Sequence, residues 1–439
     1  MNISFTSHNR PQEVLESILR NDSSLTVQDR ADKYAKMSAS PYGFFRGSNH
    51  LYWLDFFRDW HLSLYGGIPE TQTWIQGDAH IYNFGAFGNE NGDIVYGMDD
   101  FDDSIVADYQ YDLWRLAISI VLDCRDNGNF STKKIARAVR KLGKAYLKEV
   151  SSYNGNISSA DAPTAPLRSF LQTVKEKKDR KELLEKWTIL LDGNRIFRTE
   201  REKLQTMEAE EQENLAQALQ KHLHNFDHPD EPARRHFKIK DAAFRLKAGT
   251  GSLGTLRIYA LIEGSDSSTG DDVILDIKEQ TLPEACKQMS EKELKQYRRA
   301  FPDEGLRHAR AFRAISRRPD RYLGWMHWDG RDFSIRERSP FKEDFPTRDT
   351  KRAKDYRKMA KQWGGLLARG HLRGASDLGP TRATDFASYM KAIKKKRKSR
   401  FLDFLESIAT GYADCVEQDF QTFQKAIGGL VEGTLTTDH

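Results

Sequence analysis

The sequence predicts an α+β fold with a larger, mostly helical part and a smaller, antiparallel β-rich part. Apolar residues recur at helical spacing over much of the chain, in residues 11–36, 111–190, 200–224 and 355–429. A different pattern, with glycines and β-branched residues in alternation, occupies residues 242–264 and 272–280, and a hairpin is expected from residues 323–328 and 333–337. This change of pattern indicates that the main sheet forms a unit of its own.

The composition supports a folded protein with a highly charged surface. The 439 residues suffice for two or three structural units, and 38% of them are hydrophobic. The net charge of +5 is smaller than that of a dedicated nucleic-acid binder, but it suits an anionic small substrate such as a nucleotide.

The cysteines and the apolar runs set further limits. Cys124, Cys286 and Cys415 lie far apart and form no CxxC pair, so alone they supply neither a disulfide framework nor a zinc site. No run of about 20 apolar residues occurs, and the polar N-terminus holds no apolar signal segment. We therefore expect buried thiols in a cytoplasmic protein with no membrane partner.

Two short strands frame the most distinctive segment of the N-terminal half. After an aromatic-rich stretch, residues 41–65, Trp74-Ile75 is typical of a buried strand. It leads directly into the sequence GDAHIYNFG, residues 77–85. A second strand, residues 93–98, follows a hairpin turn and ends in DDFDD, residues 99–103.

The later elements predict the boundaries between units. A buried helix is expected at 111–122, a charged helix at 200–224 and a linker at 225–232. Strands then alternate with turns up to a hairpin around Asp329-Gly330. We predict three parts: residues 1–235, 236–345 and 346–439, the last packing on the first.

Asp78, Asn83 and Asp100 form the first chemical constellation. They lie at the ends of two strands joined by a short connection, so their side chains can reach one ion. Mg²⁺ prefers such carboxylate and amide oxygens together with phosphate oxygens. One aspartate then remains to orient or deprotonate a hydroxyl nucleophile. A solvated acidic turn is the alternative, but crowded carboxylates are unfavourable without a cation.

A glycine-rich loop and a lysine form the second constellation. Gly249, Gly251 and Gly254, with Ser252 between them, match GxGxxG, and the following residues look like a strand instead of a helix. That order is the kinase form, in which the loop covers the phosphates. Lys278 ends the next apolar strand, as a phosphate-contacting kinase lysine does. Its expected glutamate partner is Glu304, with Glu284 second, and an ordinary hairpin with a surface lysine is the alternative.

The GDAHIYNFG and DDFDDS segments, with Tyr111-Asp112-Leu113, resemble the catalytic core of aminoglycoside and choline phosphotransferases. The resemblance implies that Asp78 is the catalytic aspartate and that Asn83 and Asp100 bind metal, assisted by Asp102. It also implies a kinase-like, two-lobe architecture. In those kinases the glycine loop precedes the catalytic loop, whereas here it follows, so a circular permutation is expected.

Nearly the whole chain also resembles the bacterial family named domain of unknown function 2252. The resemblance rests on the segments above and on further stretches: FFRG at 44–47, WRL at 114–116, GTGSLGT at 249–255, IKE at 277–279, IR at 335–336 and HLRGASD at 371–377. The last stretch departs from the form expected at that position. Because that family has no settled function, this resemblance implies no activity.

Several other residues have two interpretations. His80 steadies the catalytic loop or touches phosphate, or else is a hydrogen-bonded structural histidine. Arg46 and Arg336 bind phosphates, or else form buried ion pairs. His371 is expected at the end of a helix, where a cation suits the helix dipole. The basic run at 394–400 is expected to be a solvated helix face.

Taken together, the motifs predict an ATP- and Mg²⁺-dependent phosphotransferase, with Mn²⁺ as an alternative metal. The expected partners are a nucleotide and a small-molecule or protein acceptor. No binding of nucleic acid is expected. Three other functions stay open: a metallophosphoesterase, because Gly-Asp-x-His also occurs in that class; a nucleotide-binding pseudokinase; and a transferase of AMP. The sequence does not identify the acceptor.

Overall fold

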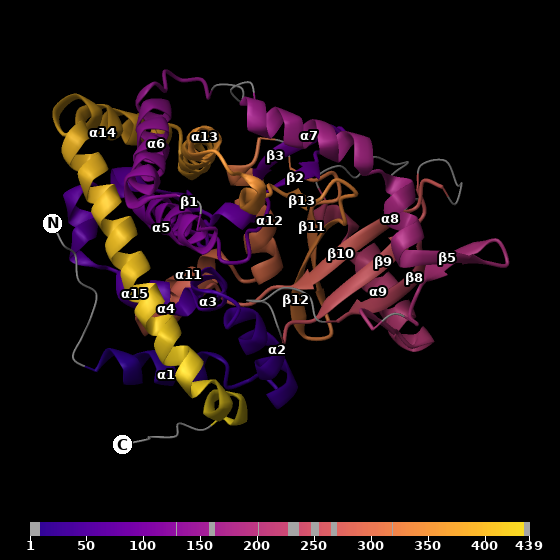
Figure 1. The fold of residues 1–439 in the computed structure, drawn as a ribbon. Helices are drawn as coiled ribbons and strands as arrows, with labels where there is room; N and C mark the ends of the chain where they lie inside the picture. The colour runs from indigo at the N-terminus through magenta and orange to yellow at the C-terminus, as the bar shows by residue number, and fades with distance from the viewer. Residues whose placement is uncertain are drawn as a thin grey trace.

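A computed structural model describes residues 9–433, apart from 129, 158–162, 201, 227–236, 247–253, 265–269 and 318. It has a mixed α+β fold in which every strand pair is antiparallel, as the sequence predicted. Figure 1 shows the helices gathered on one side and the largest sheet on the other. The expected linker at 225–232 lies mostly outside the described residues.

The largest sheet has six strands in the order β11-β12-β10-β9-β8-β7. Its strands are β7 (Leu204–Thr206), β8 (Ile239–Arg245), β9 (Arg257–Ile262), β10 (Val273–Glu279), β11 (Gly324–Trp328) and β12 (Arg331–Glu337). Successive side chains of a strand point to opposite faces of its sheet. In β9, Ile258 accordingly packs in the hydrophobic core on one face, and Tyr259 packs in the core on the other face. Both faces of the sheet are therefore covered.

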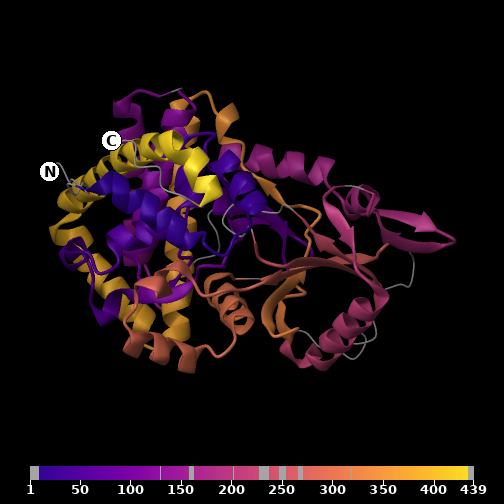
Figure 2. The same cartoon turned by 90° about the horizontal axis from the view of Figure 1, so that it is seen from below.

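Helices on either side of the sheet provide these cores. Helix α9 (Ala209–Lys221) packs Leu215 and Leu219 on one face, and α8 (Arg180–Trp187) packs Leu184 on the other. Figure 2 shows α9 on its side of the sheet. The predicted charged helix at 200–224 is wrong in its first part, since β7 occupies it. Residues from Leu184 onward thus pack on the sheet, although the boundary between the helical and the β-rich part was expected at residue 235.

The helical part is built around α5 (Gln110–Asp126), which is buried along most of its length. Around it lie α1 (Arg10–Asn21), α2 (Val27–Met37), α3 (Pro41–Gly47), α4 (Asn49–Phe56), α6 (Thr132–Ser151), α7 (Ala165–Lys177), α13 (Ala353–Leu378), α14 (Arg382–Lys396) and α15 (Lys398–Glu432). The chain ends pack together, since Arg10 of α1 forms buried ion pairs with Asp55 and with Asp419 of α15.

The remaining strands are short and carry the motif loops. They are β1 (Gln72–Ile75), β2 (Phe84–Gly88), β3 (Ile94–Met98), β4 (Ile105–Asp108), β5 (Thr188–Leu191), β6 (Asn194–Phe197) and β13 (Glu343–Asp344). The strands predicted at 74–75 and 93–98 are confirmed as β1 and β3. Two helices, α11 (Glu291–Ala300) and α12 (Glu304–Ile315), follow β10, and α12 contacts both β12 and α13. Helix α12 thus joins the sheet to the helical part.

His371 lies in the middle of α13, so the prediction that it ends a helix is wrong. Its ring contacts Tyr146 at 2.7 Å and Asp112 at 3.1 Å, both in the buried interior. Its partners are therefore side chains of neighbouring helices, and no helix dipole is involved.

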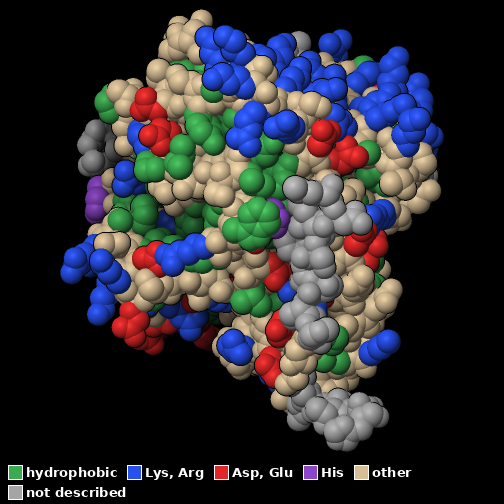
Figure 3. Space-filling model, turned by 90° about the vertical axis from the view of Figure 1, so that its left-hand side faces the viewer, with side chains coloured by type: hydrophobic (Ala, Val, Ile, Leu, Met, Phe, Trp, Pro, Cys, Tyr) green, Lys and Arg blue, Asp and Glu red, His purple; other side chains and the backbone are tan. Residues whose placement is uncertain are grey.

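The basic run at 394–400 spans the junction of α14 and α15, and residues 395–400 are exposed. On the neighbouring helix α6, Lys133, Lys134, Lys141 and Lys144 are exposed as well. Figure 3 shows Lys and Arg side chains gathered over the upper part of this face of the molecule. None of the described helices is long and apolar enough to span a membrane.

Candidate functional site

A cavity of about 320 Å³ lies between the helical part and the large sheet. Both sequence constellations line it, although Lys278 and Asp102 are 176 positions apart in the chain. Its walls include Asp78, His80, Asn83, Asp100 and Asp102 from the motif loops, Arg46 from α3, and Lys278 and Arg336 from the sheet. The candidate site residues thus converge on this cavity, apart from Glu304, Gly254 and those in the undescribed part of the glycine loop.

The loop after β1 is held by Asp112, in the first turn of α5. Its carboxylate accepts hydrogen bonds from the backbone N–H groups of Gln76 (2.6 Å) and Gly77 (2.9 Å). The Gly77 carbonyl accepts a bond from the Trp53 indole at 3.2 Å. Asp112 in turn contacts His371, so the loop rests on the buried core of the helical part. This fixes the residue that follows, Asp78.

Gly77 is also where the two motif loops cross. Its φ of +82° suits glycine, and an added Cβ would lie 1.9 Å from the Asp103 carbonyl oxygen. Gly92 has a similar φ, +79°, but nothing lies within 4 Å of a Cβ there. An alanine at Gly92 would therefore cause backbone strain alone, whereas an alanine at Gly77 would cause the same strain and a steric overlap.

We predict that Gly92→Ala lowers the free energy of unfolding by about 1–2 kcal/mol, the cost of a left-handed non-glycine residue. Gly77→Ala should cost several times more, because the Asp103 loop must move away. Urea unfolding of both variants measures this difference. Equal losses would show that the loops do not cross tightly.

Asp78 lies against two cation-capable side chains. Its carboxylate pairs with Arg115, which is fully buried in α5, and it lies 3.6 Å from Nε2 of His80. Burial raises the pKa of Asp78 to about 7, with Arg115 opposing that rise. Burial, together with nearby arginines, lowers the pKa of His80 well below its usual value. At neutral pH Asp78 is therefore poised between accepting and releasing a proton.

Asn83 connects the loop after β1 to the acidic loop. Its side-chain amide donates to the Asp78 carbonyl at 2.8 Å, which leaves the amide oxygen with no hydrogen bond to the described residues. The Asn83 carbonyl accepts bonds from Gln76 (3.2 Å) and from the Asp99 N–H (3.2 Å). Asn83 is thus fixed by its backbone and offers one free oxygen beside Asp100.

The four carboxylates of DDFDD divide into two pairs. Asp99 pairs with Lys342 at 2.5 Å, and Asp103 accepts bonds from Asn49 and from the Glu284 N–H, both at 2.8 Å. Asp100 and Asp102 line the cavity. Asp99 and Asp103 therefore hold the loop in place, whereas Asp100 and Asp102 face the cavity where a ligand can bind.

Asp100 and Asp102 have different electrostatic surroundings. Burial raises the pKa of Asp100, and the adjacent charge of Asp102 raises it further. Burial also opposes ionisation of Asp102, yet the paired ammonium of Lys278 outweighs it and holds the pKa of Asp102 well below its usual range. Asp100 forms no ion pair with any described residue. A hard cation with oxygen ligands fits Asp100, Asn83 and Asp102.

Glu304 does not pair with Lys278, so that prediction is wrong. Its carboxylate accepts bonds from Tyr297 and from Arg307, each at 2.7 Å. Arg307, fully buried, donates to the carbonyls of Phe101 (3.0 Å) and Ser104 (3.1 Å). Glu304 therefore supports the acidic loop through Arg307.

The second candidate partner, Glu284, lines the cavity but pairs with Lys287 at 2.8 Å. Lys278 pairs with Asp102 instead, an aspartate of the acidic loop. Lys278 and Asp102, a candidate metal ligand, are thus already in contact.

The glycine loop is only partly described. Gly249, Gly251 and Ser252 lie outside the described residues, whereas Gly254 has a φ of +90° and Thr255 lines the cavity. Arg336 lines it too and donates to the Asp99 carbonyl at 2.6 Å. This end of the loop and Arg336 bring further polar groups to the sheet wall.

Sequence reasoning missed four residues that organise the site: Arg115, Arg307, Lys342 and Asn49. Arg115 carried one readable signal, since an arginine within the apolar pattern of a buried helix needs a partner. Lys342 and Asn49 carried none, because their partners lie far away in the chain, and the local pair of Arg307 with Glu304 does not reveal that Arg307 also supports the acidic loop.

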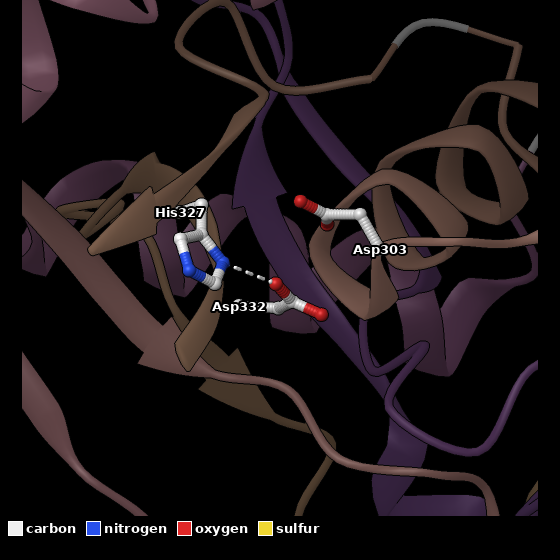
Figure 4. Close-up of side chains that lie close together, drawn as sticks. All are labelled: Asp303, His327 and Asp332. Atoms are coloured by element: carbon white, nitrogen blue, oxygen red, sulfur yellow. Dashed lines mark hydrogen bonds and ion pairs between the residues drawn. The ribbon is translucent and has the colours of Figure 1, made fainter. Parts of the chain in front are cut away.

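Asp303, His327 and Asp332 form a separate cluster, shown in Figure 4, whose ligand atoms lie within 4.8 Å of one another. Both carboxylates already cap the first turn of α12. Asp303 accepts a hydrogen bond from the Leu306 N–H at 2.8 Å, and Asp332 accepts one from the Glu304 N–H at 3.0 Å. The positive end of a helix disfavours a cation. Capping α12 therefore accounts for this cluster.

Comparison with known proteins gives one match. A family model described as an uncharacterised protein conserved in bacteria, DUF2252, matches residues 28–426. No curated protein and no solved structure matches.

Proposed function

Since the chain belongs to the DUF2252 family, whose description names no activity, we propose from the site geometry that it is an ATP- and Mg²⁺-dependent phosphotransferase. One observation carries the proposal: Lys278 of the sheet wall contacts Asp102 of the acidic loop in a single cavity that Asp78 also lines. Cations on one wall and oxygen ligands with a carboxylate base on the other suit phosphoryl transfer.

In this proposal, each group of residues that line the cavity has its own role. Lys278 and the glycine loop bind phosphate oxygens, and Asp100, Asn83 and Asp102 hold the metal. Mg²⁺ supplies charge neutralisation of the phosphates when bound. Asp78 accepts the proton of the acceptor hydroxyl, and Arg115 fixes the orientation of that carboxylate.

The order of elements around Lys278 supports a kinase-like arrangement. The glycine loop joins β8 to β9, Lys278 lies on the next strand, β10, and α11 and α12 follow, the order used in protein kinases. The catalytic loop precedes all of these in the chain, as a circular permutation would require. One difference is that the lysine pairs with Asp102 and not with a helix glutamate.

Calorimetric titration with a non-hydrolysable ATP analogue tests the proposal. We predict binding that requires Mg²⁺ and that weakens at least about tenfold in Lys278→Met, the loss of one charge-assisted contact. Lys240→Met is the matched control, because Lys240 lies on the same sheet, pairs with Asp272 at 3.0 Å and does not line the cavity.

Equal affinity with and without Mg²⁺, or an unchanged affinity in Lys278→Met, would overturn the assignment. The product of ATP turnover then separates the two transfer reactions. ADP indicates phosphate transfer, whereas pyrophosphate indicates transfer of AMP.

A further inference from the structure

Arg46 lines the cavity with no hydrogen-bond or ion-pair partner among the described residues. It lies in the last turn of α3, and its guanidinium makes neither an ion pair nor a hydrogen bond to any described residue. Its Nε is buried and unsatisfied. Other arginines near the cavity are paired, Arg115 with Asp78 and Arg257 with Asp276. A buried donor without a partner costs about 1–3 kcal/mol, so this position favours an anionic ligand.

The side chains around Arg46 are held in place. Its guanidinium lies 5.6 Å from the ring centre of Tyr82, and the Tyr82 hydroxyl is fixed by Thr347 (2.7 Å) and Asp123 (3.2 Å). A cation over a fixed aromatic ring keeps its orientation while its donors stay free. Arg46 is thus pre-organised and not a mobile surface side chain.

His80 gives an independent sign of a ligand. The side chain is only 2% exposed, it lines the same cavity, and its Nδ1 has no hydrogen-bond partner among the described residues. Tyr42 packs edge-on against both His80 and Tyr82, at 6.2 Å and 5.4 Å between ring centres, which places His80 and Arg46 in one neighbourhood. Two unsatisfied polar side chains therefore meet at one end of the cavity.

This end belongs to the helical wall. Arg46 and Asp78 both come from the N-terminal part, whereas Lys278 comes from the sheet. A ligand held by Arg46 and His80 is therefore close to the base, because Nε2 of His80 lies 3.6 Å from the Asp78 carboxylate. That is the position of the acceptor.

We propose that the acceptor is a hydroxyl compound with an anionic oxygen group, a phosphate or a carboxylate, bound by Arg46 and His80. The inference rests on the proposed phosphotransferase function. The acceptor hydroxyl oxygen forms a bond to the γ-phosphorus while the bond from that phosphorus to the bridging oxygen of ADP breaks. ADP leaves with the electron pair, and the hydroxyl proton passes to Asp78.

Inorganic phosphate and acetate, titrated separately into protein saturated with Mg²⁺ and the ATP analogue, are the probes. We expect one of them to bind the wild type, at least about tenfold weaker binding in Arg46→Met, and partial retention in Arg46→Lys, which keeps the charge but loses the planar fork. Affinity for the ATP analogue should stay within twofold in both variants. Arg125→Met, which removes an arginine paired with Asp414 on the surface, is the control.

Two outcomes overturn the subsite. If Arg46→Met binds the ATP analogue weakly, Arg46 belongs to the nucleotide site. If neither phosphate nor acetate binds the saturated wild type, no acceptor anion site exists. The same conclusion follows if Arg46→Met binds the anion as tightly as the wild type does. Failure of the wild type to bind the analogue at all is a different result, which refutes the proposed function itself.

Discussion

Replacing Asp100 with alanine is expected to weaken Mg²⁺-dependent binding of an ATP analogue by about 100-fold, which corresponds to roughly 3 kcal/mol. Asp100 forms no ion pair with the described residues, lines the same cavity as Asn83, and has a pKa that burial raises. Nearby cations, Lys278, Arg336 and Lys342, offset its charge only in part, and a bound metal would complete the compensation. Calorimetry with and without Mg²⁺ measures the loss.

The fold should survive this change, because the short hydrogen bond of Asp100 comes from its backbone, and its carboxylate accepts only a long bond, 3.4 Å, from the Asp102 N–H. The Asp100 carbonyl accepts a bond from the Gln76 amide at 2.7 Å, which alanine retains. Without metal, the melting temperature of Asp100→Ala should equal or exceed that of the wild type, since a carboxylate with only partial compensation is removed. Asp414→Ala, which removes an exposed carboxylate on α15, should change neither property. Unaltered Mg²⁺-dependent affinity in Asp100→Ala would refute the metal assignment.

The sequence predicted the site where its chemistry is local. Asp78, Asn83 and Asp100 were identified because strand ends and turns a few residues apart determine where such side chains lie. Lys278 was identified from a strand that ends in a lysine after a glycine loop. Their meeting in one cavity depends on how the sheet docks on the helices, which no local pattern specifies.

Partner assignments failed for the same reason. Glu304 has the right distance along the chain to pair with Lys278, but it pairs with Arg307 three residues away in its own helix. Lys278 takes Asp102 from a distant loop. Helical periodicity likewise gave α5 and α12, whereas it placed a helix over β7, where Leu204 enters the core of the sheet. Charge and spacing therefore identified candidates, and tertiary packing chose among them.

Arg115→Met is expected to lower the free energy of unfolding by about 2 kcal/mol at pH 8.5, because that pH lies about 1.5 units above the pKa of Asp78 and each unit is worth about 1.4 kcal/mol. Arg115 is fully buried, pairs with Asp78 and lies over the rings of Phe45 and Tyr52, at 4.2 and 5.0 Å. Methionine keeps much of that packing, so the unpaired Asp78 carboxylate accounts for most of the loss. Urea unfolding in EDTA, which keeps metals off the site, measures it.

The pH dependence of this loss has a defined sign. The pKa of Asp78 is about 7 in the folded protein, above its value of 3.8 in an unperturbed aspartate, so the folded state keeps the proton in acid and no ion pair is lost there. Removing Arg115 raises that pKa further, because Arg115 favours the charged form. The stability difference between wild type and variant should therefore be small at pH 5 and grow as the pH rises through 7.

A double-mutant cycle isolates the pair. With Asp78→Asn as the background, Arg115→Met should lose its pH dependence, since no carboxylate remains to be stranded. Arg140→Met is the matched control: Arg140 pairs with the exposed Asp403, and such surface pairs contribute about 0–1 kcal/mol. A loss of equal size at pH 5 and 8.5 in Arg115→Met would show that packing, and not the charge of Asp78, makes Arg115 necessary. Growth of the loss above pH 7 would instead identify Arg115 as the residue that keeps Asp78 ionisable as a base.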